Sequence, residues 1–248
     1  MTVKYYDWVE YQSNFRPKKI AIKEISSGRE TSYYELNHRS KSLAGWLQKK
    51  GLKKGDRVAI LAHNCAEVFE LEFACGKIGG VELPLNWRLT KPELEYILND
   101  SKPMCLIYSV EFKDIAQELI KDCGIKNSLM IEENNFGSEY EQAISENNNY
   151  ETVESNHDDL IMLMYTSGTT GHPKGAMINH QMQLFNTVNL GATARITDKT
   201  IQLVVLPLFH TGGMNCYADP ILHNGGQIVL MKEFDSGKAL EIINNIII

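Results

Sequence analysis

One eleven-residue string carries the side chains of this sequence that are best suited to chemistry. Residues 165–175 read YTSGTTGHPKG, which contains three glycines, four Ser or Thr hydroxyls and one lysine. Glycines let a backbone bend and point its N–H groups at anionic oxygens, and the hydroxyls add further donors. Lys174 adds a mobile positive charge, and Pro173 fixes one φ angle just before it. These residue types predict a loop that binds a polyphosphate. The candidate phosphate-binding residues are Thr166, Ser167, Gly168, Thr169, Thr170, Gly171 and Lys174.

The string is not a Walker A loop. That pattern requires Gly-Lys-Ser/Thr, whereas Pro173 precedes the lysine here and Gly175 follows it. The hydroxyl that usually binds magnesium is therefore absent, which disfavours a P-loop NTPase. A plain Gly/Thr-rich turn is the other alternative, and the length of the string disfavours it.

A second candidate segment is Leu206–Gly213, which reads LPLFHTGG. A predicted strand at 202–206 leads into it, and Thr211 could cap a helix that follows. An imidazole at a strand end, such as that of His210, can hydrogen-bond a carboxylate or a phosphate. A lone histidine carries little information, however. From these residues alone, a structural histidine packed beside Phe209 is the stronger interpretation.

The elements that position these segments are short apolar runs that alternate with amphipathic stretches. Leu160–Met164 is a run of strand length that ends at the glycine-rich loop, and Asn179 is a suitable N-cap for a helix over 181–192. Upstream, the spacing Thr90-Lys91-Pro92-Glu93 is typical of a capping box and predicts a helix start. Strands separated by helices of this length predict an α/β fold with stacked, helix-flanked parallel sheets. Further strands are predicted over 57–62, 81–85 and 104–108, and further helices over 34–50, 67–77 and 110–123.

Composition excludes several classes of function. Lys and Arg number 25 against 31 Asp and Glu, so the net charge of −6 argues against a nucleic-acid partner. No apolar run approaches the roughly 20 residues that span a bilayer, and the N-terminus lacks a signal-peptide core. The five scattered cysteines predict reduced thiols rather than a metal site, so we expect a cytoplasmic protein. Residues 127–159 hold nine acidic residues and no Lys or Arg, which predicts a solvated surface excursion.

The string YTSGTTGHPKGAMINH resembles the phosphate-loop signature of the adenylate-forming superfamily. That group includes acyl-CoA synthetases, the adenylation domains of nonribosomal peptide synthetases, and beetle luciferases. The resemblance covers nearly the whole chain. Thr31–Asn37 is similar to the family's early TYxEL segment, and Gly51–Ala59 is similar to its GxxxGDRVA turn and strand.

Two segments resemble the acyl-CoA synthetase branch. Val81–Leu89 reads VELPLNWRL and is similar to the PLN-aromatic-RL segment of fatty-acid and aryl-acid ligases, whereas the PxDPxYP segment of peptide-synthetase domains is absent. Leu206–Gly213 resembles the PLFHxxG element, and 222–226 the LxxGG element. The resemblance implies a ligase of the fatty-acid type that uses ATP with Mg²⁺ and coenzyme A. It also implies that Thr166–Lys174 hold the β- and γ-phosphates and that His210 borders the acyl pocket and orients the carboxylate.

The sequence departs from the family after Phe234-Asp235. The expected GxTE and TGD segments, and a small C-terminal domain with its lysine, do not follow. We therefore expect residues 1–248 to form an incomplete N-terminal AMP-binding domain without a C-terminal domain. The leading interpretation is a truncated acyl-CoA synthetase. The alternatives are a catalytically silent fragment and one half of a split enzyme whose C-terminal domain is supplied in trans.

Overall fold

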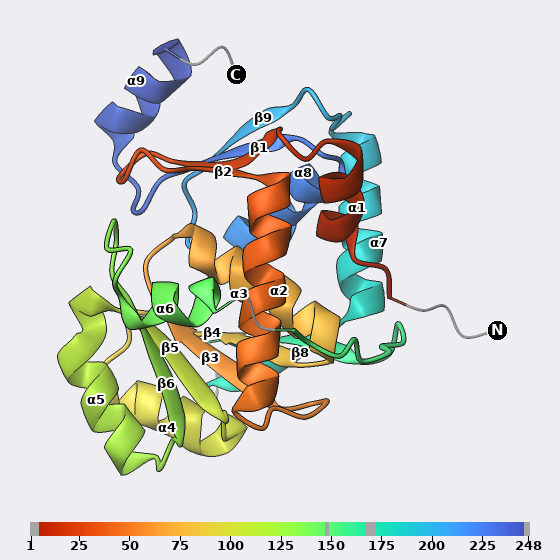
Figure 1. Ribbon diagram of the computed structural model, residues 1–248. Coiled ribbons are helices and arrows are strands. Elements are labelled where there is room, and N and C mark those ends of the chain that lie inside the picture. The colour runs from red at the N-terminus through yellow and green to blue at the C-terminus, as the bar shows by residue number, and fades with distance from the viewer. Residues whose placement is uncertain (1–4, 147–148, 167–171, 246–248) are drawn as a thin grey trace.

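Two mainly parallel sheets form the framework of the computed structural model, which describes residues 5–146, 149–166 and 172–245. A four-stranded sheet has the order β2-β1-β10-β9, and a six-stranded sheet has the order β6-β5-β3-β4-β7-β8. Helices lie between the sheets and on their outer faces (Figure 1). This arrangement confirms the predicted α/β fold with helix-flanked sheets.

The six-stranded sheet is built from the predicted alternation of strands and helices. All its neighbouring strands are parallel except β7 and β8, which form an antiparallel hairpin. The predicted capping box starts α4, where Glu93 accepts a hydrogen bond from the Thr90 backbone N–H at 2.8 Å. The strands are β3 (Arg57–Leu61), β4 (Val81–Pro84), β5 (Cys105–Ser109), β6 (Asn127–Ile131), β7 (Leu160–Thr166) and β8 (Lys174–Asn179). The helices that connect or flank them are α3 (Ala66–Ile78), α4 (Lys91–Ser101), the 3₁₀ turn η1 (Val110–Phe112), α5 (Lys113–Asp122) and α6 (Glu139–Ser145).

The four-stranded sheet joins the two ends of the chain. The β1–β2 hairpin near the N-terminus has β10 and then β9 as parallel neighbours, although about 200 residues separate β1 from β10 in the sequence. Its strands are β1 (Ile20–Glu24), β2 (Glu30–Ser32), β9 (Ile201–Val204) and β10 (Gln227–Leu230). The remaining helices are α1 (Trp8–Phe15), α2 (Tyr33–Lys49), α7 (His180–Thr193), the π-helix η2 (Gly212–Ala218), α8 (Asp219–His223) and α9 (Ser236–Asn245).

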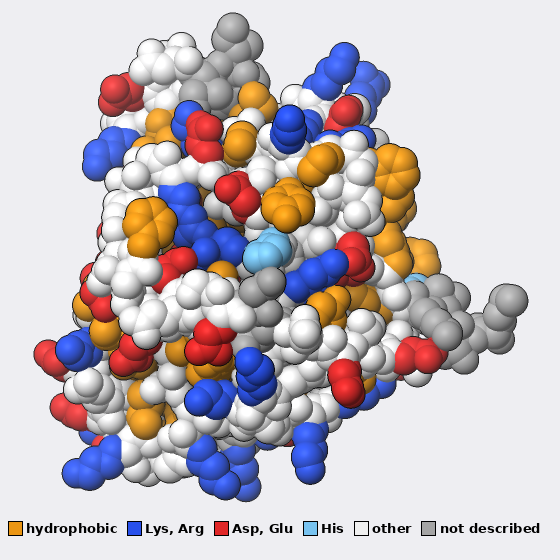
Figure 2. All heavy atoms as spheres, in the orientation of Figure 1, with side chains coloured by type: hydrophobic (Ala, Val, Ile, Leu, Met, Phe, Trp, Pro, Cys, Tyr) orange, Lys and Arg blue, Asp and Glu red, His pale blue; other side chains and the backbone are white. Residues whose placement is uncertain are grey.

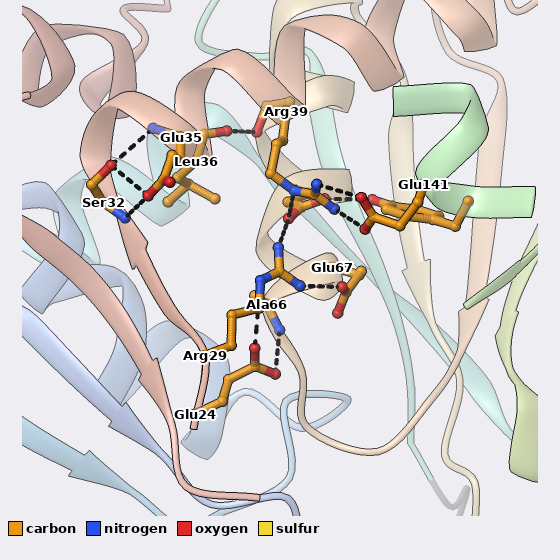
Figure 3. Close-up of polar contacts among 12 residues, drawn as sticks. Glu24, Arg29, Ser32, Glu35, Leu36, Arg39, Ala66, Glu67 and Glu141 are labelled. Atoms are coloured by element: carbon orange, nitrogen blue, oxygen red, sulfur yellow. Dashed lines mark hydrogen bonds and ion pairs between the residues drawn. The ribbon is translucent and has the colours of Figure 1, made fainter. Parts of the chain in front are cut away.

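An ion-pair network ties the two sheets together through α2 and α3. Arg29 and Arg39 both donate to Oε1 of the fully buried Glu70, at 2.9 and 2.6 Å. Arg39 also binds Glu141 of α6 with two hydrogen bonds of 2.9 and 2.6 Å. Figure 3 shows Arg29, Arg39, Glu67 and Glu141 pointing toward one another from the β1–β2 hairpin, α2, α3 and α6. The network forms part of the wall of a cavity of about 420 Å³.

The acidic segment 127–159 is more than the predicted surface excursion. It supplies β6 to the sheet and the short helix α6 to the core, and Tyr140 of α6 is 1% exposed. The Tyr140 hydroxyl donates to Oε2 of Glu70 at 2.8 Å. Acidic residues of this segment pair with basic residues from elsewhere in the chain, such as Glu141 with Arg39 and Asp159 with Lys54.

A second buried cluster consists of three carboxyls without a basic partner. Glu72, Glu82 and Asp219 are each at most 2% exposed, and none forms an ion pair within the described residues. Gln183 Nε2 bridges two of them, donating to Glu72 Oε1 at 2.5 Å and to Asp219 Oδ2 at 3.2 Å. Burial raises the pKa of all three carboxyls, that of Asp219 to about 7, and the proximity of Asp219 raises the pKa of Glu82 further.

No helix in the described part of the chain is both long enough and apolar enough to cross a membrane. The face seen in Figure 2 carries acidic and basic side chains that are intermingled.

We expect Glu82→Gln to stabilise the protein increasingly as pH rises above the ordinary glutamate pKa. The folded state holds a proton on Glu82 at pH values where the unfolded chain releases it, so wild-type stability should fall as pH rises above the ordinary glutamate pKa. Glutamine removes this penalty, and each kcal/mol regained raises the Tm of a chain of this size by about 2–4 °C. The measurement is Tm from pH 5 to pH 8, with exposed Glu241→Gln as the control. Parallel curves for wild type and Glu82→Gln would contradict a protonated Glu82.

Candidate functional site

The β7–β8 hairpin presents the two ends of the candidate phosphate loop. Thr166 is the last residue of β7 and lies opposite Lys174, the first residue of β8. Both side chains are exposed, and Lys174 makes no ion pair with the residues that the structure describes. The remaining candidates, Ser167, Gly168, Thr169, Thr170 and Gly171, lie outside the described residues.

Gly175 is required by close packing inside this hairpin. A Cβ atom at Gly175 would lie 2.8 Å from Leu163 Cδ1 and 3.3 Å from Tyr165 Cζ. The side chains of β7 thus pack across the backbone of β8 just beyond Lys174. After the hairpin, Asn179 caps α7 as predicted, because its Oδ1 accepts a hydrogen bond from the Met182 N–H at 2.8 Å.

The second candidate, His210, lies in the segment that follows β9. The strand ends at Val204, two residues earlier than predicted, and His210 is exposed. Its Nδ1 accepts a hydrogen bond from the Gly212 N–H at 3.0 Å. With Nδ1 as the acceptor, a neutral ring carries its proton on Nε2, which can donate to a substrate.

A π-helix, η2, follows His210 in place of the ordinary helix that was predicted. Its start depends on Gly213, since a Cβ there would lie 2.3 Å from the carbonyl oxygen of Pro207. The backbone of this turn therefore folds tightly against the residues that precede His210. π-Helical turns are rare and occur frequently at functional sites.

Asn64 is a site residue that sequence reasoning missed. Its side chain is nearly buried, and its Oδ1 accepts from the Leu208 N–H at 2.9 Å. Its Nδ2 donates to the carbonyl oxygens of Leu206 and Met231, each at 3.0 Å. Asn64 follows β3 of the six-stranded sheet and thereby fixes the segment that carries His210. In the sequence, the only indication of this role was that Asn64 is a polar residue shortly after the apolar strand β3.

The two segments that indicated the acyl-CoA synthetase branch lie next to each other. The Trp87 ring meets the Phe209 ring edge-on, with 6.2 Å between centroids. The Arg88 guanidinium lies 4.7 Å from the Trp87 centroid and 5.8 Å from that of Phe209. His63, beside Asn64, packs on Trp87 at 4.5 Å. The residues around His210 therefore form one aromatic cluster.

The candidate residues are positioned by two different sheets. Thr166 and Lys174 belong to a hairpin at the edge of the six-stranded sheet, whereas His210 follows a strand of the four-stranded sheet. Within the described residues, no group of three or more His, Cys, Asp or Glu could hold a metal ion. His180 is not part of either segment: it is 2% exposed, and its ring packs against that of Tyr5 with centroids 4.2 Å apart.

Comparison with known proteins places the chain in a family. The sequence profile of the AMP-binding enzyme family matches residues 9–246. Feruloyl-CoA synthase of Amycolatopsis sp is 33% identical over 236 residues, which are 95% of this chain and 45% of that protein. Long-chain-fatty-acid–CoA ligase FadD13 of Mycobacterium tuberculosis is 29% identical over 229 residues, covering 92% of this chain and 45% of that protein. The chain thus spans about half the length of the curated relatives it matches.

Solved structures show the same fold. ATP-bound MatB from Rhodopseudomonas palustris superposes with a TM-score of 0.85 at 28% identity, over 96% of this chain and 47% of that one. The inhibitor-bound N-terminal domain of FACL13 from Mycobacterium tuberculosis gives a TM-score of 0.82 at 27% identity, over 95% and 59%. The profile match over nearly the whole sequence shows that this chain belongs to the AMP-binding, adenylate-forming enzyme family.

Proposed function

We propose that this chain supplies the phosphate loop and acyl-site segment of an acid–CoA ligase that activates a carboxylic acid with ATP, with a fatty acid favoured. The observation that carries the proposal is the β7–β8 hairpin, in which Lys174 and the Thr166 hydroxyl lie opposite each other and are exposed, with no ion pair from Lys174 to any residue that the structure describes. The names of the relatives, which include feruloyl-CoA and long-chain-fatty-acid–CoA ligases, support the reaction class.

The hairpin residues would act in the first half-reaction. A carboxylate oxygen attacks the α-phosphorus of ATP, the bond to the β-phosphate oxygen breaks, and pyrophosphate leaves. Negative charge builds up on the departing phosphates, so the ammonium of Lys174 and a donor at Thr166 would stabilise the transition state more than the bound substrate. Mg²⁺ accompanies the nucleotide in our proposal and neutralises part of the phosphate charge.

His210 would orient the acid. Its Nδ1 is held by the Gly212 N–H, so Nε2–H is the group free to donate to a carboxylate oxygen. Orientation of the attacking oxygen matters because misplacement by about 1 Å can cost 10²-fold in rate. In the second half-reaction the thiol of coenzyme A attacks the acyl carbon, forming a thioester and releasing AMP.

The extent of the functional unit is also a proposal. We assign residues 1–248 to part of an N-terminal adenylation domain, with the phosphate loop at 165–175 and the acyl segment at 206–213. Coverage of about 45% of the curated relatives favours one further candidate, a chain that is silent until the remaining portion is supplied, in cis or in trans. The five cysteines, all free, are compatible with the cytoplasm as its compartment.

The test is acid-dependent exchange of pyrophosphate into ATP. We expect no exchange from residues 1–248 alone, and we expect exchange once they are continued by the corresponding remainder of a CoA-ligase relative. A panel of fatty and aromatic acids would then identify the substrate class. Exchange by the 248-residue chain alone, abolished by Lys174→Ala, would show that the essential site lies within it.

In that extended protein, Lys174→Ala should slow adenylation by roughly 10²–10³, the scale of losing one preorganised charge-stabilising donor. Thioester formation from supplied acyl-adenylate should change much less, because pyrophosphate has already left. The matched control is Lys199→Ala, which removes another exposed lysine. Equal losses in both half-reactions would mean that Lys174 does not act on the pyrophosphate side.

His210→Ala should raise the KM for the acid by about tenfold, the scale of one lost hydrogen bond to a charged group. The Tm should change little because the side chain is exposed. His210→Gln retains an acceptor for the Gly212 N–H. Comparing it with His210→Ala therefore distinguishes the hydrogen bond to the backbone from the proposed contact with the acid. A large fall in Tm with unchanged turnover would instead support a histidine that only packs against its neighbours.

A further inference from the structure

Helix α4 contacts the chain on both sides of residues 167–171. On the β7 side, the Tyr165 hydroxyl donates to Oδ2 of Asp100 at 2.5 Å. On the β8 side, the His172 ring stacks on the Tyr96 ring, with centroids 4.9 Å apart and planes inclined by 18°. Because Tyr96 and Asp100 are four residues apart, they share one face of α4. A single helix face therefore holds both arms of the candidate phosphate loop.

The Tyr165 side chain is fixed on more than one side. In the hairpin, Tyr165 lies opposite Gly175, and the lack of a side chain on Gly175 lets the phenol ring pack over the backbone. Burial raises the pKa of Tyr165, and the hydrogen bond to Asp100 raises it further, so the hydroxyl remains a donor at neutral pH. The ring and the hydroxyl together orient the last residues of β7.

The helix that provides these contacts is itself firmly anchored. Leu94, Ile97 and Leu98 are each 1% exposed, so one face of α4 is buried in the core. Lys91 at its start binds Glu118 and Asp122 of α5, each at 2.7 Å. The face that carries Tyr96 and Asp100 therefore keeps a defined position relative to the six-stranded sheet.

We propose that Tyr96 and Asp100 are positioning residues that fix both arms of the phosphate loop and so preorganise Thr166 and Lys174 for a polyphosphate. The proposal rests on the proposed function for its ligand, but the two contacts exist without one. Each contact restricts one end of the loop. When the residues that flank a binding loop are already fixed, less conformational entropy is lost when the ligand binds. Supporting contacts of this kind also keep the binding side chains in the correct geometry.

The contacts can be tested without any ligand, by hydrogen exchange in the 248-residue chain. We expect Asp100→Ala and Tyr165→Phe each to speed exchange at 165–166 and 172–175 by about three- to tenfold, the loss of one hydrogen bond. Tyr96→Ala should do the same at 172–175. The conservative variants Asp100→Asn and Tyr96→Phe keep the acceptor and the ring and should stay near wild type. Asn99→Ala, an exposed neighbour on α4, is the matched control.

Two exchange results would overturn the proposal. Wild-type exchange in both Asp100→Ala and Tyr96→Ala would show that α4 does not hold the arms. Faster exchange spread equally over β3, β4 and β5 would show that these residues only stabilise the fold. The double variant Asp100→Asn, Tyr165→Phe should match Tyr165→Phe alone. In both variants the Tyr165 hydroxyl, which would donate to the side-chain oxygen of residue 100, is missing.

A second experiment adds MgATP to the same variants in the extended protein defined above, whose unsubstituted form is the wild type here. If the proposed function is right, MgATP slows exchange at 165–175 in the wild type, and Asp100→Ala and Tyr96→Ala require at least about threefold more nucleotide for the same protection. In the extended enzyme, the KM for ATP should rise more than kcat falls. No protection of the wild type would count against the proposed function, whereas the ligand-free result would still decide the role of α4.

Discussion

The structure depends most on the buried carboxylate of Glu70. Burial opposes its ionisation, yet Arg39 and Arg29 overcome that cost and lower its pKa, and the Tyr140 hydroxyl binds its second oxygen. Each partner comes from a different element, so one charge organises the β1–β2 hairpin, α2, α3 and α6 (Figure 3). Removing one partner of a buried pair typically costs about 3–5 kcal/mol because the other charge stays uncompensated. These ion pairs therefore fix how the sheets face each other.

That relationship between sheets matters because the candidate site is divided between them. Lys174 is on the six-stranded sheet and His210 follows the four-stranded one. Asn64 is a second link between the sheets. It follows β3 of the six-stranded sheet, and its side chain hydrogen-bonds the backbone of Leu206 and Leu208 after β9, and of Met231 after β10, in the four-stranded sheet. If Lys174 holds phosphates and His210 orients an acid, their separation is set by these links and not by either segment alone.

The sequence predicted what short-range patterns determine. The strands β3, β4, β5 and β7, the capping box at Thr90, and the cap at Asn179 follow from apolar runs and residue spacing within one element. Long-range partners could not be found this way. Arg39 meets Glu141 across 102 residues, and Asn64 meets Leu208 across 144. The acidic segment 127–159 looked solvated for the same reason, since Arg39, which pairs with Glu141, lies far away in the chain. The roles of Thr166, Lys174 and His210 remain predictions.

Two buried glutamates of α3 differ in their charge state. Glu70 and Glu72 are two residues apart on α3 and both are buried, yet they point toward different surroundings. Glu70 faces two guanidiniums and ionises, whereas Glu72 faces Gln183 and other carboxyls, and its pKa is raised. The amide of Gln183 can satisfy a protonated pair by donating to both Glu72 and Asp219, but it supplies no charge. One side of α3 thus carries a fixed ion network that holds elements together, and the other stays neutral. Because the neutral side gains charge as pH rises, alkaline conditions should loosen the contacts of α3 with α7 and α8 before they affect the arginine network.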